Sequence, residues 1–560
     1  MKITRWTRRG FLRATGMAST IAALSLHRAE AAVEAKAKSS EGPINLLFIM
    51  TDQQRFDTLG RAGNTVLKTP HLDSLARDGA YFENAYTNCP ICVPARAVIL
   101  TGRTIESVRV RGNNDCETND GADVETFDNI LARHDYHTEY YGKWHSPFKF
   151  AATYKNAVRQ TGKHARGADV PGQAAAYKAY LDRYTKPRQP RKGELLDKGT
   201  GRPYVPDELD WRYGADLGKY EKRLRAAREA ARRAGKDPKK ARPKGLNLAS
   251  QAGSYGCLDV PAAHSRTAFV AGEVIAALER VKDKPFSLTC SFGPPHPPMI
   301  LPKPYYGMFP AGEITPPSSI DDPMVNSPYA ARAAQAEMKR YRNKAHVRQM
   351  MSNYYGMVAE VDHWVGQILA KLKELGLAER TLVIFTSDHG EMLGDHGLHS
   401  KMVFYEGAAH IPLLMRLPGV IDAGSAVAAP VSHVDLFATI LDYLQMPAQP
   451  TEGRSLRKVI DGDEDRGPDY CVSEWGSRRG PTLMVRTKDW KYITSHSPKS
   501  TVVDALYDLR NDPHEMTNLI GDNPRKADHV RQARKMKARL VEWLTRIRSP
   551  RLAGVKARHI

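Results

Sequence analysis

The segment INLLFIMTDQQRFD (Ile44–Asp57) joins a nearly unbroken apolar run to a polar turn. Such a run is typical of a strand that is buried on both faces, as in a parallel sheet. Polar side chains at the carboxyl end of such a strand lie where α/β sheets build their binding sites. The segment therefore predicts a sheet covered by helices, with Asp52 and Gln53 at the edge that carries function.

Two further segments repeat this pattern. RTLVIFTSDHGEMLGDHG (Arg380–Gly397) is an apolar strand followed by Asp388 and His389. PFSLTCSFGPPHPP (Pro285–Pro298) is a third apolar strand, and it leads to His296. Polar residues thus follow all three predicted strands, and this repetition is the main organisational signal in the chain.

The composition is that of a globular protein. Hydrophobic residues make up 41% and charged residues 26% of the 560 residues, which is enough to bury a large core. A chain of this length is expected to form about two to four domains, or one large α/β domain with an appendage. The net charge of +21, from 83 Lys and Arg against 62 Asp and Glu, favours acidic partners without selecting one.

The first residues have the features of an export signal. A basic segment with Arg8 and Arg9 precedes a short apolar stretch, 17–26, and small residues at cleavage spacing, 29–32. The apolar stretch is too short for a stable membrane anchor, and the paired arginines resemble a twin-arginine signal. We therefore expect residues 1–31 to be a signal peptide of a bacterial protein that is periplasmic or secreted. The alternative is a basic N-terminal helix on a cytosolic protein.

A basic insertion interrupts the pattern of strands at about 185–250. Twelve Lys or Arg residues and three acidic residues lie between Lys219 and Lys244, in a segment of helix-forming composition. Such a segment is either a solvated surface helix or a patch that meets a polyanion. The sequence leaves both alternatives open.

The texture of the chain changes after Gln449. Before it, MVAEVDHWVGQILAKLKELG (Met357–Gly376) has the apolar spacing of a helix that packs against a sheet. Beyond it, short apolar segments are followed by a basic helical segment near 525–547. We therefore expect a catalytic α/β domain over 43–450 and a smaller C-terminal α+β subdomain over 451–555.

The segment TNCPICVPARAVILTGR (Thr87–Arg103) contains two cysteines and admits two interpretations. Cys89 and Cys92 form a C-x-x-C pair, which is found in thioredoxin-like and zinc sites. A zinc site would need further ligands, and the sequence has no second C-x-x-C. Redox and zinc chemistry are therefore disfavoured, and a thiol-redox protein is the weakest alternative.

The same segment resembles the signature of the type I sulfatases, within the alkaline phosphatase superfamily. Cys92-x-Pro94-x-Arg96 is followed by Leu-Thr-Gly-Arg at 100–103, and Ala95 replaces the usual serine of the motif. The resemblance implies an alkaline-phosphatase-like sandwich with a mixed, mostly parallel central sheet. It also implies that Cys92 is converted to formylglycine by a formylglycine-generating enzyme, which is the expected partner.

An aldehyde hydrate has a chemical advantage over a simple alcohol as the nucleophile. An alcohol would be left as a sulfate ester that is hard to hydrolyse, whereas a gem-diol carries a second hydroxyl group. Deprotonation of that hydroxyl expels sulfate and regenerates the aldehyde, so covalent catalysis here contains its own exit.

The resemblance also identifies a candidate metal site. The residues at the matching positions are Asp52, Gln53, Cys92, Asp388 and His389. All except His389 offer oxygen once Cys92 is converted, which suits Ca²⁺, with Mg²⁺ as the alternative. Many family members carry a second aspartate where this chain has Gln53. The Asp-Gln pair resembles phosphonate monoester hydrolases, which share the formylglycine machinery.

Further matching residues would hold the sulfuryl group and move protons. The candidate catalytic residues are Cys92, Arg96, Lys143, His145, His296 and Lys401. By resemblance, Lys143 and Lys401 hold the sulfate oxygens, and Arg96 orients the nucleophile. His145 takes the proton of the gem-diol, whereas His296 contacts the ester oxygen and protonates the leaving group. A metal and two lysines around one sulfuryl group give the electrostatic preorganisation that the transfer needs.

Asn113 and His396 are weaker candidates for substrate binding. Asn113 lies in VRVRGNND, and His396, like His399, follows the strand that leads to the metal site. Near the C-terminus, LYDLRNDPHEMTNL (Leu506–Leu519) resembles a further signature of the same family. The resemblance therefore extends over roughly 43–545, and the basic insertion is its least family-like part.

We expect an exported enzyme that hydrolyses sulfate monoesters, with sulfated carbohydrate as the expected substrate. A phosphonate or phosphate monoester hydrolase and a choline-sulfatase-like enzyme for a small sulfate remain alternatives, because leaving-group specificity lies in loops that motifs do not describe. A non-catalytic binder of sulfated polymers is an alternative of another class, and the complete residue set argues against it. A nucleic acid partner is not expected.

Overall fold

The computed structural model describes residues 42–116, 118, 125–149, 173–185, 188–191, 194–197, 201–206, 226, 228–235, 255–463, 467–475, 480 and 482–560. The expected signal peptide and most of the basic insertion lie outside these residues, so both stay predictions.

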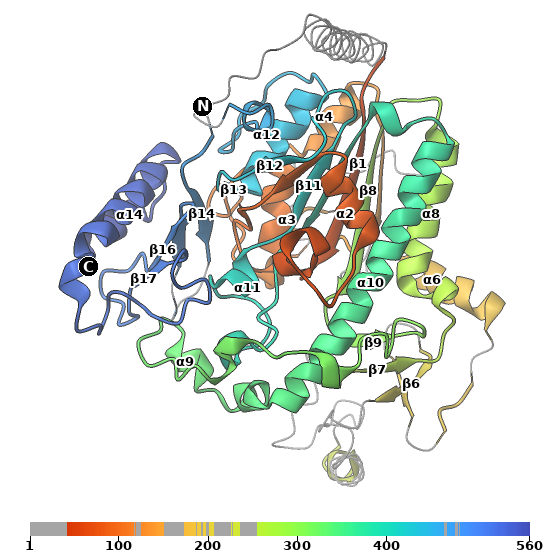
Figure 1. Cartoon of the computed structure of the whole chain (residues 1–560). Coiled ribbons are helices and arrows are strands. Elements are labelled where there is room, and N and C mark those ends of the chain that lie inside the picture. The colour runs from red at the N-terminus through yellow and green to blue at the C-terminus, as the bar shows by residue number, and fades with distance from the viewer. Residues whose placement is uncertain are drawn as a thin grey trace, which may run out of the picture.

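A seven-stranded sheet forms the centre of the molecule (Figure 1). Across the sheet, its strands are β12 (Ser425–Val427), β2 (Ala80–Phe82), β11 (Leu413–Arg416), β10 (Thr381–Ser387), β1 (Asn45–Asp52), β8 (Phe286–Pro295) and β4 (His137–Gly142). The strands β10, β1, β8 and β4 are parallel, and β11 is antiparallel to both of its neighbours. The sheet is therefore mixed and mostly parallel, which confirms the predicted fold class.

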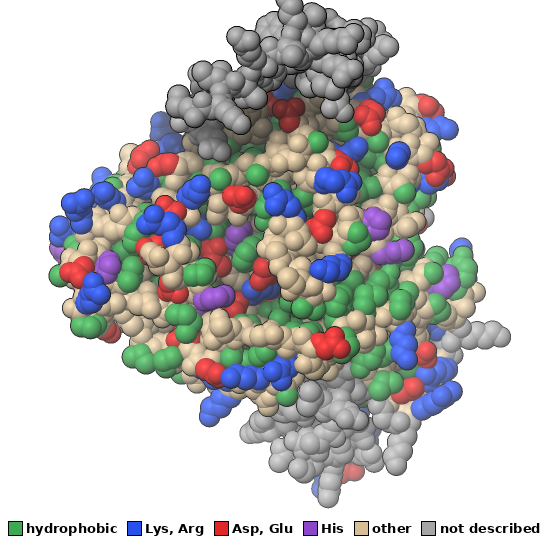
Figure 2. All heavy atoms as spheres, in the orientation of Figure 1, with side chains coloured by type: hydrophobic (Ala, Val, Ile, Leu, Met, Phe, Trp, Pro, Cys, Tyr) green, Lys and Arg blue, Asp and Glu red, His purple; other side chains and the backbone are tan. Residues whose placement is uncertain are grey.

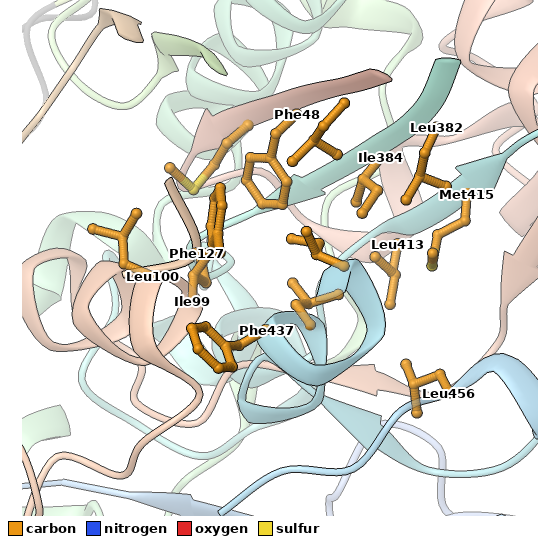
Figure 3. Close-up of a cluster of buried hydrophobic side chains, with 14 of the residues drawn as sticks. Phe48, Ile99, Leu100, Phe127, Leu382, Ile384, Leu413, Met415, Phe437 and Leu456 are labelled. Atoms are coloured by element: carbon orange, nitrogen blue, oxygen red, sulfur yellow. The ribbon is translucent and has the colours of Figure 1, made fainter. Parts of the chain in front are cut away.

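Helices cover both faces of this sheet, because successive strand residues point to opposite sides. Leu46, Phe48 and Met50 of β1 belong to one buried cluster, and Leu47 and Ile49 belong to another. The first cluster includes side chains of α3 (Cys92–Thr101), α4 (Phe127–Arg133) and α12 (Val434–Tyr443), as Figure 3 shows in part. The second includes side chains of α2 (Pro70–Arg77), α8 (Arg266–Val281) and α10 (Lys344–Glu374).

The helix α10 is longer than the sequence pattern predicted. The expected helix at 357–376 is its second half, and the first half begins at Lys344. Asn343 caps this end, because its side-chain oxygen accepts hydrogen bonds from the amides of Ala345 and His346. Residues of the first half pack into a third buried cluster rather than under the central sheet, which explains the different apolar pattern.

Part of the chain between β4 and α10 forms a small sheet at one end of the molecule (Figure 1). Its strands are β5 (Leu195–Leu196), β6 (Pro203–Pro206), β7 (Tyr255–Leu258) and β9 (Met299–Leu301). The helix α6 (Gln173–Tyr184) packs beside it through Tyr177 and Leu181. The strands β5 and β6 lie within the region at about 185–250 in which the basic insertion was expected, and β7 and β9 follow it.

The C-terminal residues form an antiparallel sheet with a helix packed on it, at the left of Figure 1. Its strands are β14 (Cys471–Glu474), β15 (Leu483–Arg486), β16 (Trp490–Thr494) and β17 (Ala505–Asp508), and its helices are α14 (Lys526–Arg546) and α15 (Leu552–Ala557). The predicted basic helix near 525–547 is α14. The remaining elements are β3 (Ala85–Tyr86), β13 (Val431–Ser432), α9 (Ala330–Ala333), α11 (Glu406–Ala409) and α13 (Arg457–Ile460).

Among the described residues, no helix combines the length and the apolar character needed to cross a lipid bilayer.

Candidate functional site

The site begins with a sharp turn at the end of β1. Asp52 is the last residue of the strand, and Gln53 has a φ of 70°, which is sparsely populated for residues other than glycine. Tyr354 of α10 holds this turn, because its hydroxyl donates to the Gln53 carbonyl at 2.6 Å and accepts from the Arg55 amide at 3.0 Å. The backbone amide of Gln53 donates a hydrogen bond to Oδ1 of Asp388 at 3.1 Å. The turn thus places the two strand-end carboxylates beside each other.

Cys92 is the first residue of α3, and its side chain is completely buried. Its Sγ lies 3.2 Å from Nε2 of His389, 3.4 Å from Nζ of Lys401 and 3.7 Å from Nζ of Lys143. The positive end of the helix dipole and the nearby cations favour negative charge at this position. The structure therefore brings together residues that the sequence separates widely.

Four side chains offer ligand atoms to one divalent cation. The donor atoms of Asp52, Cys92, Asp388 and His389 all lie within 4.8 Å of one another. His389 Nδ1 lies 2.9 Å from the Gly390 carbonyl, so this nitrogen carries the proton. The lone pair of Nε2 is therefore free to bind a metal ion together with the other three ligand atoms. Two carboxylates, an imidazole nitrogen and the side chain at position 92 fit a divalent metal ion.

Arg96 lies one helical turn after Cys92, and its guanidinium makes hydrogen bonds to the two carboxylates of the site. Its Nε donates to Asp388 at 2.9 Å, and its Nη2 donates to Asp52 at 3.3 Å. Its Nη1 donates to the Lys143 carbonyl at 2.7 Å and to the Ser291 hydroxyl at 2.9 Å. Arg96 therefore fixes both carboxylates and the backbone of Lys143, rather than contacting Cys92 through a hydrogen bond.

The ammonium groups of two lysines lie near Cys92 Sγ. The ammonium of Lys143 donates to Asp52, and that of Lys401 donates to Oε1 of Gln53 at 2.5 Å. The side-chain nitrogen of Gln53, Nε2, in turn donates a hydrogen bond to Glu391. The structure thus gives the side chain of Gln53, which was predicted as a metal ligand, hydrogen bonds that link Lys401 to a buried carboxylate.

The charges of the site shift the pKa of its acids in opposite directions. Burial alone would raise the pKa of Asp52, but Lys143 and Lys401 hold it well below its usual range. Burial also opposes ionisation of the Cys92 thiol, yet the same two lysines lower its pKa well below the usual value. Burial and the charge of Asp52 raise the pKa of Asp388. A surplus of positive charge therefore surrounds Cys92 on the lysine side.

Two histidines were predicted to transfer protons, and the structure shows both as half-buried. His145 follows Trp144 in a loop and has a φ of 36°, and none of the described residues makes a hydrogen bond with its Nδ1. His296 follows β8, and its Nδ1 lies 2.6 Å from the Pro297 carbonyl. Burial, Lys401 and Lys143 lower the pKa of His296 to about 3, which places this imidazole within the electrostatic field of the site.

The two weaker candidates for substrate binding lie in different places. Asn113 accepts a hydrogen bond from the Val93 amide at 3.1 Å, so it caps the start of α3 next to Cys92. His396 is buried against Asp322, at 2.6 Å, and stacks on Tyr405. It lines a separate cavity of about 360 Å³. Its contacts thus tie His396 to the neighbouring core and not to Cys92.

Several contacts of the site could not be predicted from motifs. Glu391 accepts hydrogen bonds from Gln53, from the Leu393 amide and from the Ser400 amide, and Tyr140 and Ser291 support Arg96. Glu391 was within the quoted strand segment, but a buried carboxylate that binds backbone amides has no characteristic spacing. The signal that could have indicated it is an acidic residue close to the Asp388-His389 pair, within the same segment.

Comparisons with known proteins show which family this chain resembles. A family model described as sulfatase matches residues 44–446, and one described as the C-terminal part of N-sulphoglucosamine sulphohydrolase matches residues 394–545. The chain is 28% identical to an arylsulfatase of Clostridium perfringens over 498 residues, which cover 87% of this chain and 93% of that protein. It is 25% identical to an N-acetylglucosamine-6-O-sulfatase of Bacteroides thetaiotaomicron over 524 residues, which cover 89% and 86%.

Solved structures show the same fold. One is a protein in complex with its substrate D-glucosamine-2-N,6-O-disulfate, with a TM-score of 0.63 and 20% identity over 91% of this chain and 99% of that one. Another is the phosphonate monoester hydrolase of Agrobacterium radiobacter, with a TM-score of 0.65 and 25% identity over 90% and 96%.

Proposed function

The chain belongs to the sulfatase family, and from this premise we propose that it removes sulfate from sulfated carbohydrates with Cys92, converted to formylglycine, as its nucleophile. The chain is a sulfuric ester hydrolase. The observation that carries the proposal is the position of Cys92, whose sulfur marks the place of the oxygen nucleophile. It lies 3.2 Å from His389 and 3.4 Å from Lys401.

A bound divalent cation would supply positive charge beside the nucleophile and the sulfuryl oxygens. Asp52, Asp388, His389 and the side chain at position 92 would hold it, with the Gln53 amide as a further neighbour. We propose Ca²⁺, with Mg²⁺ as the alternative, because carboxylate and amide oxygens suit these ions. The imidazole of His389 also suits Zn²⁺, which makes this ion the competitor in metal analysis.

Conversion of Cys92 would supply a hydrated aldehyde, whose first hydroxyl attacks sulfur and whose second releases the sulfate. The chain's own residues orient and neutralise the charges of this transfer. Lys143 and Lys401 would hold the sulfuryl oxygens, which is supported by the short distances from their ammonium groups to Cys92 Sγ. Arg96 fixes the carboxylates of Asp52 and Asp388, so the negative ligands do not reorganise as charge moves.

The two histidines divide the proton transfers. We propose that His145 accepts the proton of the gem-diol, which its free Nδ1 and its half-exposed position allow. We propose that His296 protonates the leaving oxygen. Because its Nδ1 is bound to a carbonyl, Nε2 is the atom that exchanges this proton.

The proposal of a carbohydrate substrate rests on relatives. The chain is similar along most of its length to an N-acetylglucosamine-6-O-sulfatase. We also propose that a formylglycine-generating enzyme acts on the chain and that the twin-arginine signal carries it to the periplasm. The complete burial of Cys92 supports conversion before folding, because an enzyme cannot reach this side chain in the folded protein.

A second candidate function is hydrolysis of phosphonate or phosphate monoesters. Gln53 in place of a second aspartate makes the site less negative, which favours a phosphate monoester, because this substrate is a dianion whereas sulfate and phosphonate monoesters carry one negative charge. The similarity to a phosphonate monoester hydrolase agrees with this alternative. A smaller substrate such as choline sulfate is a variant of the first function, since the same sulfuryl machinery would serve it.

The test is a comparison of kcat/KM for four substrates with protein produced beside a formylglycine-generating enzyme. The substrates are 6-sulfated N-acetylglucosamine, choline sulfate, nitrophenyl sulfate and a phenylphosphonate monoester. We expect the sulfated sugar to have the highest value and the Cys92→Ala variant to be inactive on all four. Preference for the phosphonate ester would replace the proposal with the second candidate.

A further inference from the structure

Lys401 stands on a backbone segment of unusual conformation. The residues on either side of it, Ser400 and Met402, have φ angles of 71° and 72°. Neither is a glycine, so both occupy the left-handed region that side chains other than that of glycine rarely adopt. Such a conformation persists only where surrounding contacts over-determine it, and it is common at functional sites. The question is which contacts hold Lys401 in place.

Backbone hydrogen bonds fix the segment only in part. The Ser400 amide donates to Glu391, and the Ser400 carbonyl accepts from the Met392 amide at 2.9 Å. The Met402 amide donates to the Pro90 carbonyl at 3.0 Å, which ties the segment to the loop before Cys92. The carbonyls of His399 and Lys401 receive their hydrogen bonds from elsewhere, and buried carbonyls without donors are costly.

Arg332 supplies both of these hydrogen bonds from α9. Its Nη1 donates to the Lys401 carbonyl at 2.5 Å, and its Nη2 donates to the His399 carbonyl at 2.7 Å. The two carbonyls are two residues apart, which suits the rigid fork of a guanidinium. Burial lowers the pKa of Arg332, and the charge of Glu391 offsets this only in part. Among the described residues, no carboxylate lies within ion-pair distance of the guanidinium. Burial of the guanidinium therefore costs solvation free energy, and the two hydrogen bonds described here go to backbone carbonyls.

A second contact brings the same segment of chain against the Lys401 loop. Tyr329, which precedes α9, accepts a hydrogen bond from the Phe404 amide at 2.8 Å. Ser327 lies 2.7 Å from the hydroxyl of Tyr405. The residues 327–332 thus brace the loop along several successive positions, and Arg332 is the one that reaches Lys401 itself.

We propose that Arg332 is a positioning residue that sets the Lys401 ammonium beside position 92 by clamping the backbone on both sides of Ser400. The inference rests on the proposed function, in which Lys401 holds a sulfuryl oxygen. Removing the clamp leaves two carbonyls without donors, and the segment relaxes from its left-handed conformations. A small shift of the backbone then moves the ammonium away from the site of charge development, which slows the reaction.

The experiment is a double-mutant cycle on nitrophenyl sulfate with Arg332→Met and Lys401→Met. Methionine removes the donors of Arg332 and keeps an unbranched side chain of similar length. We expect Arg332→Met alone to reduce kcat/KM about 10- to 100-fold, as for residues that orient a binding group. In the Lys401→Met background, the same change should cost less than about 3-fold, because the two residues act as one unit. Arg332→Lys, which retains one donor, should restore part of the loss.

Arg348→Met is the matched control. Arg348, on α10, is also half-buried, and it donates to a backbone carbonyl that is not part of the Lys401 loop, that of Ile314 at 3.1 Å. Its replacement should leave kcat/KM within about 2-fold of the parent, because no catalytic group depends on it. Equal losses in both backgrounds of the cycle would mean that Arg332 supports the fold in general, and would overturn the inference.

A second readout does not depend on catalysis. Hydrogen exchange of the amides in residues 399–404 should become faster in Arg332→Met and stay unchanged in Arg348→Met. Unchanged exchange in Arg332→Met would overturn the clamp, whatever the activity. Faster exchange with unchanged turnover would retain the clamp and remove Lys401 from the proposed mechanism. The two failures are therefore distinguishable.

Discussion

His296 illustrates how single residues of this site depend on their surroundings. Burial and the charges of Lys401 and Lys143 lower the pKa of its imidazole to about 3, so it is neutral in the free protein near pH 7. An anionic ester bound at the two lysines would offset their charge and raise this pKa again. His296 can therefore gain its proton when the substrate is present, which suits a general acid.

We predict that His296→Gln affects substrates according to their leaving groups. A sugar alkoxide needs a proton as it leaves, whereas nitrophenolate does not. The loss in kcat should be about 100-fold or more for a sulfated sugar and below about 10-fold for nitrophenyl sulfate, as expected for a general acid. Steady-state kinetics with both substrates measure this, and equal losses would assign His296 to substrate binding.

The nitrogen ligand of the metal site is a second residue with a distinct chemical signature. His389 presents Nε2 because its Nδ1 is bound to the Gly390 carbonyl. We predict that His389→Asn, which replaces nitrogen with oxygen, lowers the affinity for Zn²⁺ more than that for Ca²⁺, by about 10-fold or more. Titration of the chelator-treated protein with each ion measures this. A uniform loss for both ions would show that His389 acts on the fold of the site and not on metal choice.

At the scale of elements, the strand β14 connects the C-terminal sheet to the loop before Cys92, and it carries a buried carboxyl group, that of Glu474. The backbone amide of Glu474 donates a hydrogen bond to the carbonyl of Asn88, which lies four residues before Cys92. The side chain of Glu474 is buried, and one of its oxygens has no hydrogen-bond partner among the described residues. Burial raises its pKa to about 8 from a usual 4.5. Glu474 therefore stays protonated in the folded protein at neutral pH.

This raised pKa predicts a pH-dependent stability. Between about pH 4.5 and 8 the unfolded chain releases a proton that the folded chain keeps, so the contribution of Glu474 is present below pH 4.5 and is lost as the pH rises towards 8. Glu474→Gln removes this loss. Its stability relative to the parent should rise by on the order of 3 kcal/mol between pH 5 and pH 8.

Urea unfolding at the two pH values measures this difference. Glu279→Gln, at an exposed position of α8, is the control and should follow the parent at both values. A constant difference between Glu474→Gln and the parent would show that Glu474 is ionised in the folded protein.

A buried ion cluster makes the second connection between elements. Lys491 of β16 is fully buried and contacts Glu406 of α11 and Glu515, each at 2.6 Å. We predict that Lys491→Met destabilises the protein by about 3 to 5 kcal/mol, because it leaves Glu515 buried without its cation and removes the nearest cation of Glu406. Thermal unfolding measures this, with exposed Lys488→Met as the control. Glu515→Gln in the Lys491→Met background should recover part of the loss, and no recovery would contradict the explanation.

The sequence predicted those elements whose residues carry a local pattern. The strands β1, β8 and β10 are apolar runs followed by polar residues, and all three were predicted. The first half of α10 was missed, because it packs in a different cluster and has a different apolar spacing. Arg332 and Glu391 were missed for another reason. They bind backbone atoms of distant segments, and such contacts leave no spacing in the sequence.

At the scale of the whole molecule, the site exists only in the complete fold. Gln53 and Lys401, which share a hydrogen bond, are 348 positions apart. The sequence analysis could assign such distant residues to one site only because the family resemblance gives the order of its motifs along the chain. It could not supply their contacts, and His396 accordingly lies in a neighbouring cavity. The division into 43–450 and 451–555, the signal peptide and the role of the basic insertion stay predictions.

The folded state also constrains when Cys92 can be modified. Every residue of α3 is buried, so the proposed conversion would have to precede folding, and the proposed twin-arginine route carries folded protein. The account therefore predicts that active protein recovered from the periplasm already contains the aldehyde.

The mass of the tryptic peptide Asp78–Arg96 from such an active preparation tests the central claim most directly. The account predicts a peptide lighter than the thiol form by about the mass of one water molecule, with fragmentation placing the change at Cys92 and not at Cys89. The fraction of converted peptide should rise with specific activity from one preparation to the next. A fully active preparation in which Cys92 remains a thiol would contradict the account.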